Sequence, residues 1–162
     1  MAVENTAKLN KLASLFSPHA TLYLVGGCVR DKLLCTACYD IDICSKLTVD
    51  EVKTILLNTD FVVSDRCLRM GTVHISSGDF VAEYTTFRTD SYDRDSGKHH
   101  PDFVKFTDDM LLDARRRDFK CNALYEDILT GEIVDMVGGL QDIKNKIIST
   151  ADDAQTVFEA DG

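Results

Sequence analysis

Two aspartates, Asp40 and Asp42, alternate with isoleucines in the segment YDIDIC. Residues two apart in a strand point to the same face, so a strand over residues 40–44 would present both carboxylates together and turn Ile41 and Ile43 toward the core. Burying carboxylates is costly unless a cation compensates them, and carboxylate oxygens are ligands that magnesium prefers. The pair therefore predicts a divalent metal site. An aspartate pair that is merely solvated at a sheet edge has the same pattern.

A Gly-Gly turn, Gly26 and Gly27, stands upstream of this pair, after an apolar β-prone run. Such a turn lets backbone amides approach a ligand closely, and the first turn of a following helix offers N–H groups to an anion. Phosphate binding beside a metal site points to nucleotide chemistry. Two Mg²⁺ ions held by paired aspartates can activate an attacking hydroxyl and stabilise a leaving pyrophosphate.

Two further groups of polar residues accompany these motifs. Glu83, in the alternating segment VAEYTTFR, is the candidate for a third acidic ligand, although an isolated glutamate in a strand is more often a surface residue. The arginine run 115–117 leads into Asp118 and, four residues later, Asn122. Arginine suits bidentate phosphate contacts. Cations that complement a helix C-terminus would explain one or two of the arginines, but not the spacing of Asp118 and Asn122.

The elements that must position these residues alternate between helical and strand patterns. The first helix is expected over residues 3–16, and a capping box at Thr48 and Glu51 opens another. Tight turns at 77–78 and 130–131 predict two hairpins. The remaining strands are expected at 21–25, 40–44, 61–64, 71–76 and 79–88, with helices after the Gly-Gly turn to about 34, over 107–117, and from 138–139 to about 146. This order predicts one α/β (α+β) domain whose mixed sheet is flanked by helices.

Two segments carry weaker patterns. Residues 89–101 are polar and contain glycine and proline, which favours a loop beside the sheet. Residues 151–162 place Ala154, Val157 and Phe158 at helical spacing and then stop. We expect them to begin a helix that the chain leaves incomplete.

Composition limits the classes of function. The formal net charge of −9 argues against a broad basic surface for nucleic acid, so any grip on RNA must be local or lie elsewhere. No apolar run reaches the roughly 20 residues of a membrane span, and the N-terminus lacks the pattern of a signal peptide, so a cytoplasmic protein is expected. The sequence does not indicate the oligomeric state.

Six cysteines raise a competing interpretation. Without an export signal they are expected to be reduced thiols. A single C-x2-C pair, Cys35 and Cys38, is flanked by Cys28 and Cys44, which leaves a zinc site open as an alternative. Strong zinc patterns contain two such pairs at regular spacing, so this interpretation is the weaker one.

Several motifs in order resemble the class II tRNA nucleotidyltransferase and poly(A) polymerase family, which includes bacterial CCA-adding enzymes. The similar segments span nearly the whole chain: LVGGCVRDKLL with DIDI, VAEYTTFRTD, RRRDFKCNAL and VGGLQDIKNKIIST. The chain departs from the family pattern at Cys35, 120–121 and 136–137, none of which is a candidate ligand.

The resemblance implies a nucleotidyltransferase head domain over 1–150 and the start of a nucleotide-selecting neck helix over 151–162. It implies that Asp40 and Asp42 bind Mg²⁺, with Glu83 as the third acidic residue. The implied nucleotide contacts are Gly26, Gly27, Arg30, Arg117, Asp118, Asn122 and Asp161. Asp161 would be the aspartate of an Asp-x-x-Arg element whose arginine lies beyond residue 162.

The implied activity is transfer of nucleotides from ATP and CTP to the 3′ end of tRNA or another RNA, with CCA addition as the leading expectation. Poly(A), CC- or A-adding activity stays open as an alternative. So does a fragment that binds nucleotide or metal without independent catalysis, because residues that grip RNA in relatives are expected outside this chain.

Overall fold

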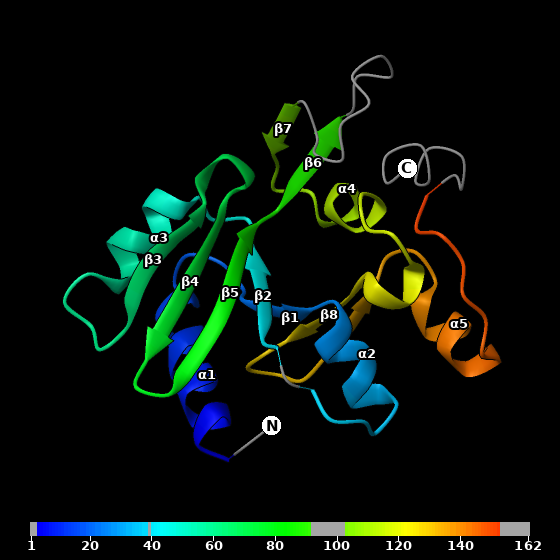
Figure 1. Ribbon diagram of the computed structural model, residues 1–162, viewed down its shortest axis with the longest axis horizontal. Coiled ribbons are helices and arrows are strands. Elements are labelled where there is room, and N and C mark those ends of the chain that lie inside the picture. Colours follow the sequence, from blue (N-terminus) through cyan, green and yellow to red (C-terminus); the bar gives the residue numbers. More distant parts are fainter. Residues whose placement is uncertain (1–2, 39, 92–102, 153–162) are drawn as a thin grey trace.

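A seven-stranded mixed sheet organises the protein, in the order β3-β4-β5-β2-β1-β8-β9. The computed structural model describes residues 3–38, 40–91 and 103–152 (Figure 1). The strands of this sheet are β1 Tyr23–Val25, β2 Asp42–Ser45, β3 Val62–Cys67, β4 Thr72–Ser77, β5 Phe80–Thr86, β8 Leu124–Asp127 and β9 Ile133–Asp135. A separate pair joins β6 Arg88–Ser91 to β7 Phe103–Phe106. The helices are α1 Val3–Phe16, α2 Gly27–Leu33, α3 Val49–Leu56, α4 Met110–Arg115 and α5 Gly139–Asn145, with 3₁₀ turns at Leu68–Met70 and Lys120–Asn122.

The pairing of β2 with β5 is parallel, and every other pairing in the large sheet is antiparallel. This mixed α/β architecture confirms the predicted fold class. Alternation in the central strands turns Ile43 and Tyr84 toward one face and leaves Asp42 and Glu83 on the other. The parallel register places Asp42 directly opposite Glu83.

The two faces of the sheet are covered differently. The first face carries the larger core, built with apolar residues of α1, α2 and α3 such as Leu12, Val29 and Val52. The second face carries a smaller cluster around Phe87 and Tyr125, packed near Ala114 of α4. In Figure 1, α1 lies behind β4 and β5, and no described helix lies over their near face. Glu83 of β5 lies on this uncovered face, which we call the bare face.

Local signals in the sequence account for several elements. The Thr48–Glu51 capping box forms as predicted: Glu51 N donates to Thr48 Oγ1 at 3.4 Å, and Thr48 N donates to Glu51 Oε2 at 2.8 Å. The two predicted hairpins also form, as β4–β5 and β8–β9. Within the described residues, none of the helices is both long and apolar enough to span a membrane.

Three differences between the predicted elements and the structure concern residues near the site. The strand expected over 40–44 begins only at Asp42, so Asp40 lies in a bend before it. The helix expected over 107–117 is shorter, because Asp109 caps it by accepting from Leu111 N at 2.8 Å, and it ends at Arg115. The loop expected over 89–101 begins as strand β6, which pairs with β7. The rest of that loop and residues 153–162 lie outside the described residues.

Candidate active site

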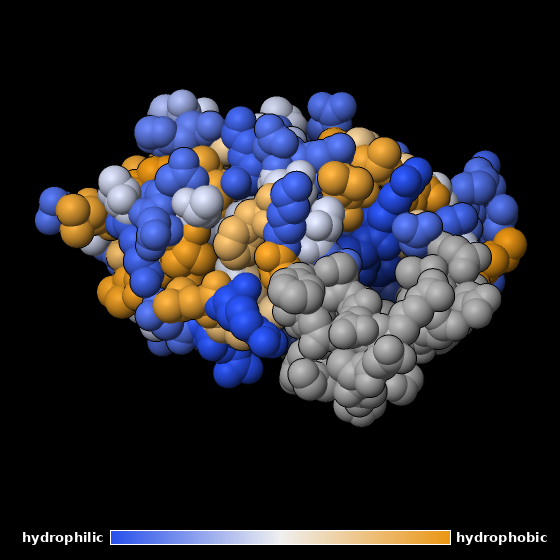
Figure 2. All heavy atoms as spheres, turned by 90° about the horizontal axis from the view of Figure 1, so that it is seen from above, coloured by the Kyte–Doolittle hydropathy of each residue, from blue (hydrophilic) through white to orange (hydrophobic). Residues whose placement is uncertain are grey.

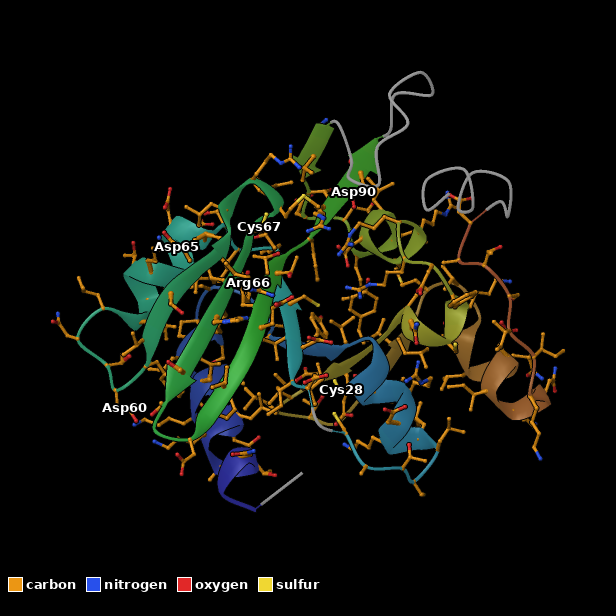
Figure 3. The ribbon with its side chains drawn as sticks, viewed as in Figure 1. Cys28, Asp60, Asp65, Arg66, Cys67 and Asp90 are labelled. Atoms are coloured by element: carbon orange, nitrogen blue, oxygen red, sulfur yellow. The ribbon has the colours of Figure 1, made fainter. Side chains whose placement is uncertain are left out.

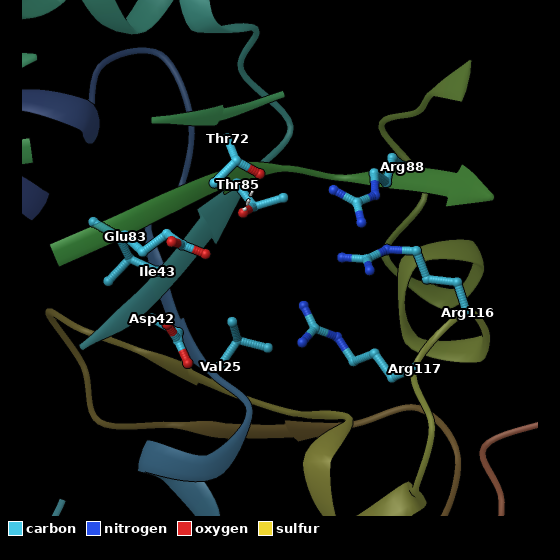
Figure 4. A pocket seen from close by; sticks show the side chains of 9 residues that line it. All are labelled: Val25, Asp42, Ile43, Thr72, Glu83, Thr85, Arg88, Arg116 and Arg117. Atoms are coloured by element: carbon cyan, nitrogen blue, oxygen red, sulfur yellow. Dashed lines mark hydrogen bonds between the residues drawn. The ribbon is translucent and has the colours of Figure 1, made fainter. Parts of the chain in front are cut away.

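A polar cleft of about 240 Å³ opens on the second face of the sheet, where β2 and β5 meet α4. Figure 4 shows two carboxylates, Asp42 and Glu83, on one side and three guanidinium groups on the other. The residues that line the cleft are Val25, Asp42, Ile43, Thr72, Glu83, Thr85, Arg88, Arg116 and Arg117. Its two oppositely charged sides suit a ligand that combines anionic and cation-bound groups.

The carboxylate side is built by the register of β2 and β5. Asp42 is partly buried, and its pKa is raised by that burial, by the nearby Glu83 carboxylate and by Asp40, against an opposing effect of Arg117. Burial is the largest of these causes, and the repulsion from Glu83 and Asp40 adds to it because three carboxylates lie near one another at this edge. A cation bound between Asp42 and Glu83 would remove that cost, so the donors present fit a hard divalent ion such as Mg²⁺.

The predicted triad of acidic residues is only partly assembled. Asp42 and Glu83 line the cleft together, whereas Asp40 is exposed in the bend before β2 and does not line it. Among the described residues, no three His, Cys, Asp or Glu side chains are grouped closely enough to hold a metal ion. Strand β2 begins at Asp42, so Asp40 precedes the strand whose face it was expected to share with Asp42.

One buried aspartate, Asp113 of α4, binds Arg116 and Arg117 on the guanidinium side. Arg117 Nη2 donates to Asp113 Oδ2 at 3.0 Å, Arg116 Nε donates to Asp113 Oδ1 at 2.8 Å, and the Tyr125 hydroxyl donates to Asp113 Oδ2 at 2.7 Å. Burial alone would lower the pKa of Arg117, but the Asp113 carboxylate and neighbouring groups raise it above its ordinary value. Arg117 therefore stays charged, and the bonds to Asp113 hold both arginines in fixed orientations.

Arg88 completes the cationic wall from strand β6. Its side chain donates to Met70 O at 2.7 Å and to Asp90 Oδ1 at 2.9 Å, and its backbone N–H donates to Asp113 Oδ1 at 3.1 Å. Burial and the proximity of Arg116 lower its pKa, although an arginine stays protonated at neutral pH. Neither Arg88 nor Asp113 was identified as a site residue from the sequence. Asp113 stands four residues before Arg117 in a helical pattern, and this spacing could have identified Asp113 from the sequence.

The Gly-Gly turn lies between the two charged sides. Gly26 has φ 78° and ψ −142°, a conformation that favours glycine. A Cβ added there would lie 3.8 Å from Asp42 Oδ2 and 3.9 Å from Arg117 Nη1. Gly27 begins α2. Gly26 therefore lies beside two of the residues that line the cleft, although neither glycine lines it.

The other predicted nucleotide contacts form a second group beside α2. Arg30 Nη1 donates to Asn122 Oδ1 at 2.7 Å, and Asn122 Nδ2 donates to Asp118 Oδ1 at 3.3 Å. Arg30 also pairs with Asp31 at 2.8 Å. The structure thus connects Arg30, Asn122 and Asp118 with one another, outside the residues that line the cleft. Asp161 lies outside the described residues.

The cysteines do not gather into a metal site within the described part of the chain. All six are free thiols. Burial and the nearby Cys38 raise the pKa of Cys28 to about 12, and among the described residues no three His, Cys, Asp or Glu side chains are grouped to hold a metal ion. The zinc interpretation finds no support in this arrangement.

Comparisons with known proteins agree with the geometry. Residues 22–149 match the family model described as the poly A polymerase head domain. The CCA-adding enzyme of Lactobacillus helveticus is 40% identical over 139 residues, which cover 86% of this chain and 33% of that enzyme. The crystal structure of the Bacillus stearothermophilus CCA-adding enzyme in complex with CTP superposes with a TM-score of 0.81 at 30% identity, covering 99% of this chain and 37% of that one.

A more distant structure, the Thermotoga maritima CCA-adding enzyme complexed with tRNA, has a TM-score of 0.67 at 22% identity and covers 93% of this chain and 33% of that one. At that identity the likeness concerns the fold. The chain spans about a third of the length of the curated relatives it matches.

Proposed function

Because the chain belongs to the family of poly(A) polymerase head domains, we propose that it is the catalytic head of a CCA-adding tRNA nucleotidyltransferase. The reaction transfers a nucleoside monophosphate from CTP or ATP to the 3′ hydroxyl of an RNA. The hydroxyl gives up its proton to solvent and its oxygen bonds to the α-phosphorus, while the bond from that phosphorus to the bridging oxygen breaks and pyrophosphate leaves.

The observation that carries this proposal is the division of charge in the cleft. Asp42 and Glu83 face three guanidinium groups across it. A nucleoside triphosphate needs cationic donors along its β- and γ-phosphates, and in-line transfer needs acidic groups that position a cation near the attacked phosphorus. A cleft for a neutral or purely cationic ligand would not place Arg88, Arg116 and Arg117 on one wall.

The arginines act as a preorganised phosphate clamp. Their side chains are mostly buried, at 11%, 14% and 15% exposed for Arg88, Arg116 and Arg117. Buried guanidinium groups that are held by carboxylates lose little further freedom when they bind phosphate, and they stabilise the charge that develops on the leaving pyrophosphate. The Gly26 turn keeps the space between clamp and carboxylates free of a side chain.

The acidic residues are assigned to the metal and the acceptor hydroxyl. Asp42 and Glu83 are the proposed ligands at the cleft, and Asp40, close enough to influence the pKa of Asp42, is proposed as a further ligand. Mg²⁺ bound there would lower the pKa of the RNA hydroxyl and neutralise phosphate charge. Arg30, Asp118 and Asn122 are proposed to contact the nucleotide next to the Gly27 end of α2, and Asp161 to contribute to the choice of base.

The test is extension of a tRNA that lacks its CCA end, with labelled CTP and ATP and with Mg²⁺. Asp42→Asn is expected to abolish incorporation, because it removes charge from the proposed ligand without changing its size. Asp79→Asn, a matched change in the exposed β4–β5 turn, should leave incorporation unchanged. Normal turnover by Asp42→Asn would refute the assignment, and the nucleotides added would separate CCA from CC, A or poly(A) products.

Binding of CTP by the same chain, measured by calorimetry, separates a catalytic head from a binding module. A chain that binds CTP but never extends RNA would support the module interpretation.

A further inference from the structure

The bare face of β3, β4 and β5 continues the catalytic cleft on its carboxylate side. A row of register partners crosses four strands there, Ser64 with His74, His74 with Glu83, and Glu83 with Asp42. Alternation points these side chains toward the second face of the sheet, away from α1 and α3. The row therefore leads from the cleft outward across an open polar surface.

Arg66 stands beside this row because of an irregularity in β3. The pairing of β3 with β4 shifts between Asp65 and Cys67, so Arg66 is an extra residue without a register partner. Such bulges re-aim a side chain and are over-represented next to active sites. Arg66 Nε lies 4.0 Å from Glu83 Oε2, and Figure 3 shows the Arg66 side chain over the strands that border the cleft.

The Arg66 guanidinium retains capacity for a ligand. Its side chain is 64% exposed, and its described ion pair is the long one to Glu83. Glu83 is held more closely by His74, whose Nε2 lies 3.3 Å from the same Oε2. A guanidinium has five N–H donors, and those of Arg66 that do not face Glu83 can bind an incoming anion at the edge of the cleft.

The geometry of the proposed reaction indicates which anion would bind to Arg66. In an in-line displacement the attacking and leaving oxygens lie on opposite sides of the phosphorus. If the arginine clamp of Arg88, Arg116 and Arg117 holds the leaving pyrophosphate, the attacking RNA end must approach from the side of Glu83. The strand that carries the 3′ hydroxyl then passes over the bare face, where a phosphate of its backbone meets Arg66.

We infer that the bare face of β3–β5 binds the 3′-terminal backbone of the RNA acceptor, with Arg66 as a phosphate ligand. This inference rests on the proposed function, since it assumes that the arginine clamp holds the leaving pyrophosphate. An acidic chain of net charge −9 gains local attraction for RNA by such a placement without a broad basic surface.

The test compares Arg66→Gln with Lys53→Gln in the whole chain. Lys53 pairs with Asp65 at 2.8 Å, so this control removes one positive charge next to the same strand but not from the bare face. Affinity for a short fluorescent single-stranded RNA is measured by anisotropy over a series of salt concentrations, and affinity for CTP by calorimetry.

Arg66→Gln is expected to weaken RNA binding roughly tenfold, as for the loss of a charged hydrogen bond. It should also reduce the slope of log affinity against log salt by about 0.7, as for the loss of one single-strand phosphate contact. CTP affinity should stay unchanged, and Lys53→Gln should alter neither quantity. A salt slope equal to that of the unsubstituted chain, an equal loss in Lys53→Gln, or no RNA binding by the unsubstituted chain would overturn the inference.

A second measurement locates the RNA directly. An RNA that ends in 4-thiouridine is irradiated in complex with the chain, and the cross-linked peptides are identified by mass spectrometry. Cross-links within residues 62–86 are expected, and cross-links confined to other peptides would also overturn the inference. Failure of CTP to bind would instead count against the proposed function, so the two failures are distinguishable.

Discussion

Arg117 Nη2 and Asp113 Oδ2 are 3.0 Å apart across one helical turn at the end of α4. The Asp113 side chain is 1% exposed and also accepts hydrogen bonds from Arg116, from the Tyr125 hydroxyl and from the backbone N–H of Arg88. One buried carboxylate therefore links all three arginines of the cleft. The orientation of the proposed phosphate clamp depends on a residue that does not line the cleft itself.

Replacing Asp113 by alanine should strongly destabilise the fold. The change leaves buried guanidinium groups without their carboxylate, and loss of one partner of a buried ion pair costs about 3–5 kcal/mol. Urea unfolding followed by circular dichroism measures the difference. Asp108→Ala, an exposed aspartate just before α4, is the control and should change the free energy of unfolding by less than about 0.5 kcal/mol. A similarly small effect of Asp113→Ala would contradict the linking role.

The same carboxylate predicts how stability depends on pH. Burial opposes ionisation of Asp113, but Arg117, Arg116 and the Tyr125 hydroxyl outweigh it and lower the pKa of Asp113. A carboxyl whose folded pKa is depressed stabilises the protein above its unfolded pKa of about 3.9, and this contribution is lost as the pH falls toward the folded pKa. The stability advantage over Asp113→Asn should therefore be full at neutral pH and shrink in acid below about pH 4. Urea unfolding of both proteins across that range checks it, and a constant difference would refute it.

Local patterns in the sequence identified the elements that depend on neighbouring residues. The capping box at Thr48 and the tight turn at Gly78 are encoded within a few positions, and the alternation around Glu83 gave its correct face. The sequence also predicted Glu83 on a strand that neighbours the strand of Asp42, and the register of β2 and β5 confirms this placement. These features depend on hydrogen bonds and side-chain direction over short spans.

The features that sequence patterns missed depend on contacts between distant segments. Strand β6 is polar, so no apolar alternation marked it, and it forms by pairing with β7 and through the bond of Arg88 to Asp90. In the sequence Asp113 is like any helical aspartate, because its bonds to Arg88 N and to the Tyr125 hydroxyl form only in the folded structure. Strand β2 begins at Asp42, two residues later than its composition suggests, so Asp40 lies before it. Periodicity contains no information on such enclosure.

Asp135 should stabilise the start of α5. Its Oδ1 accepts from the backbone N–H groups of Val137, Gly138 and Gly139, and its Oδ2 accepts from that of Leu140 at 2.9 Å. Loss of a capping side chain costs about 0.5–2 kcal/mol, and the upper end is expected for Asp135→Ala because four donors are released. Thermal unfolding measures the loss.

The control for this cap is Glu132→Ala, an exposed residue before β9. It should leave the melting temperature within about 1–2 °C of the original, since surface changes alter stability by less than about 0.5 kcal/mol. Equal effects of the Asp135 and Glu132 substitutions would show that the carboxylate contributes nothing as a cap.

Gly139 should not tolerate a side chain. A Cβ built there would lie 2.2 Å from Lys120 O, a backbone atom that cannot move away without shifting the 3₁₀ turn Lys120–Asn122. Overpacking of this kind costs about 1–3 kcal/mol or more. Gly131→Ala is the comparison, because Gly131 has φ 74° but open space around it, so only the left-handed strain of about 1–2 kcal/mol applies. Gly139→Ala unfolding at the same urea concentration as the original chain would contradict the close packing.

The three consecutive arginines offer the sharpest functional comparison. Helix α4 ends at Arg115, which is exposed, and the chain then turns so that Arg116 enters the cleft with its side chain 14% exposed. If the cleft holds a triphosphate, Arg116→Gln should weaken CTP binding roughly tenfold or more, as expected for a lost charge-assisted hydrogen bond. Arg115→Gln removes the same charge one residue earlier and should alter CTP affinity by less than about twofold, because exposed charges are screened by solvent. Calorimetric titration measures the affinity of both variants for CTP, and circular dichroism verifies that each is folded. Equal losses would mean that net charge, and not the geometry of the clamp, determines binding.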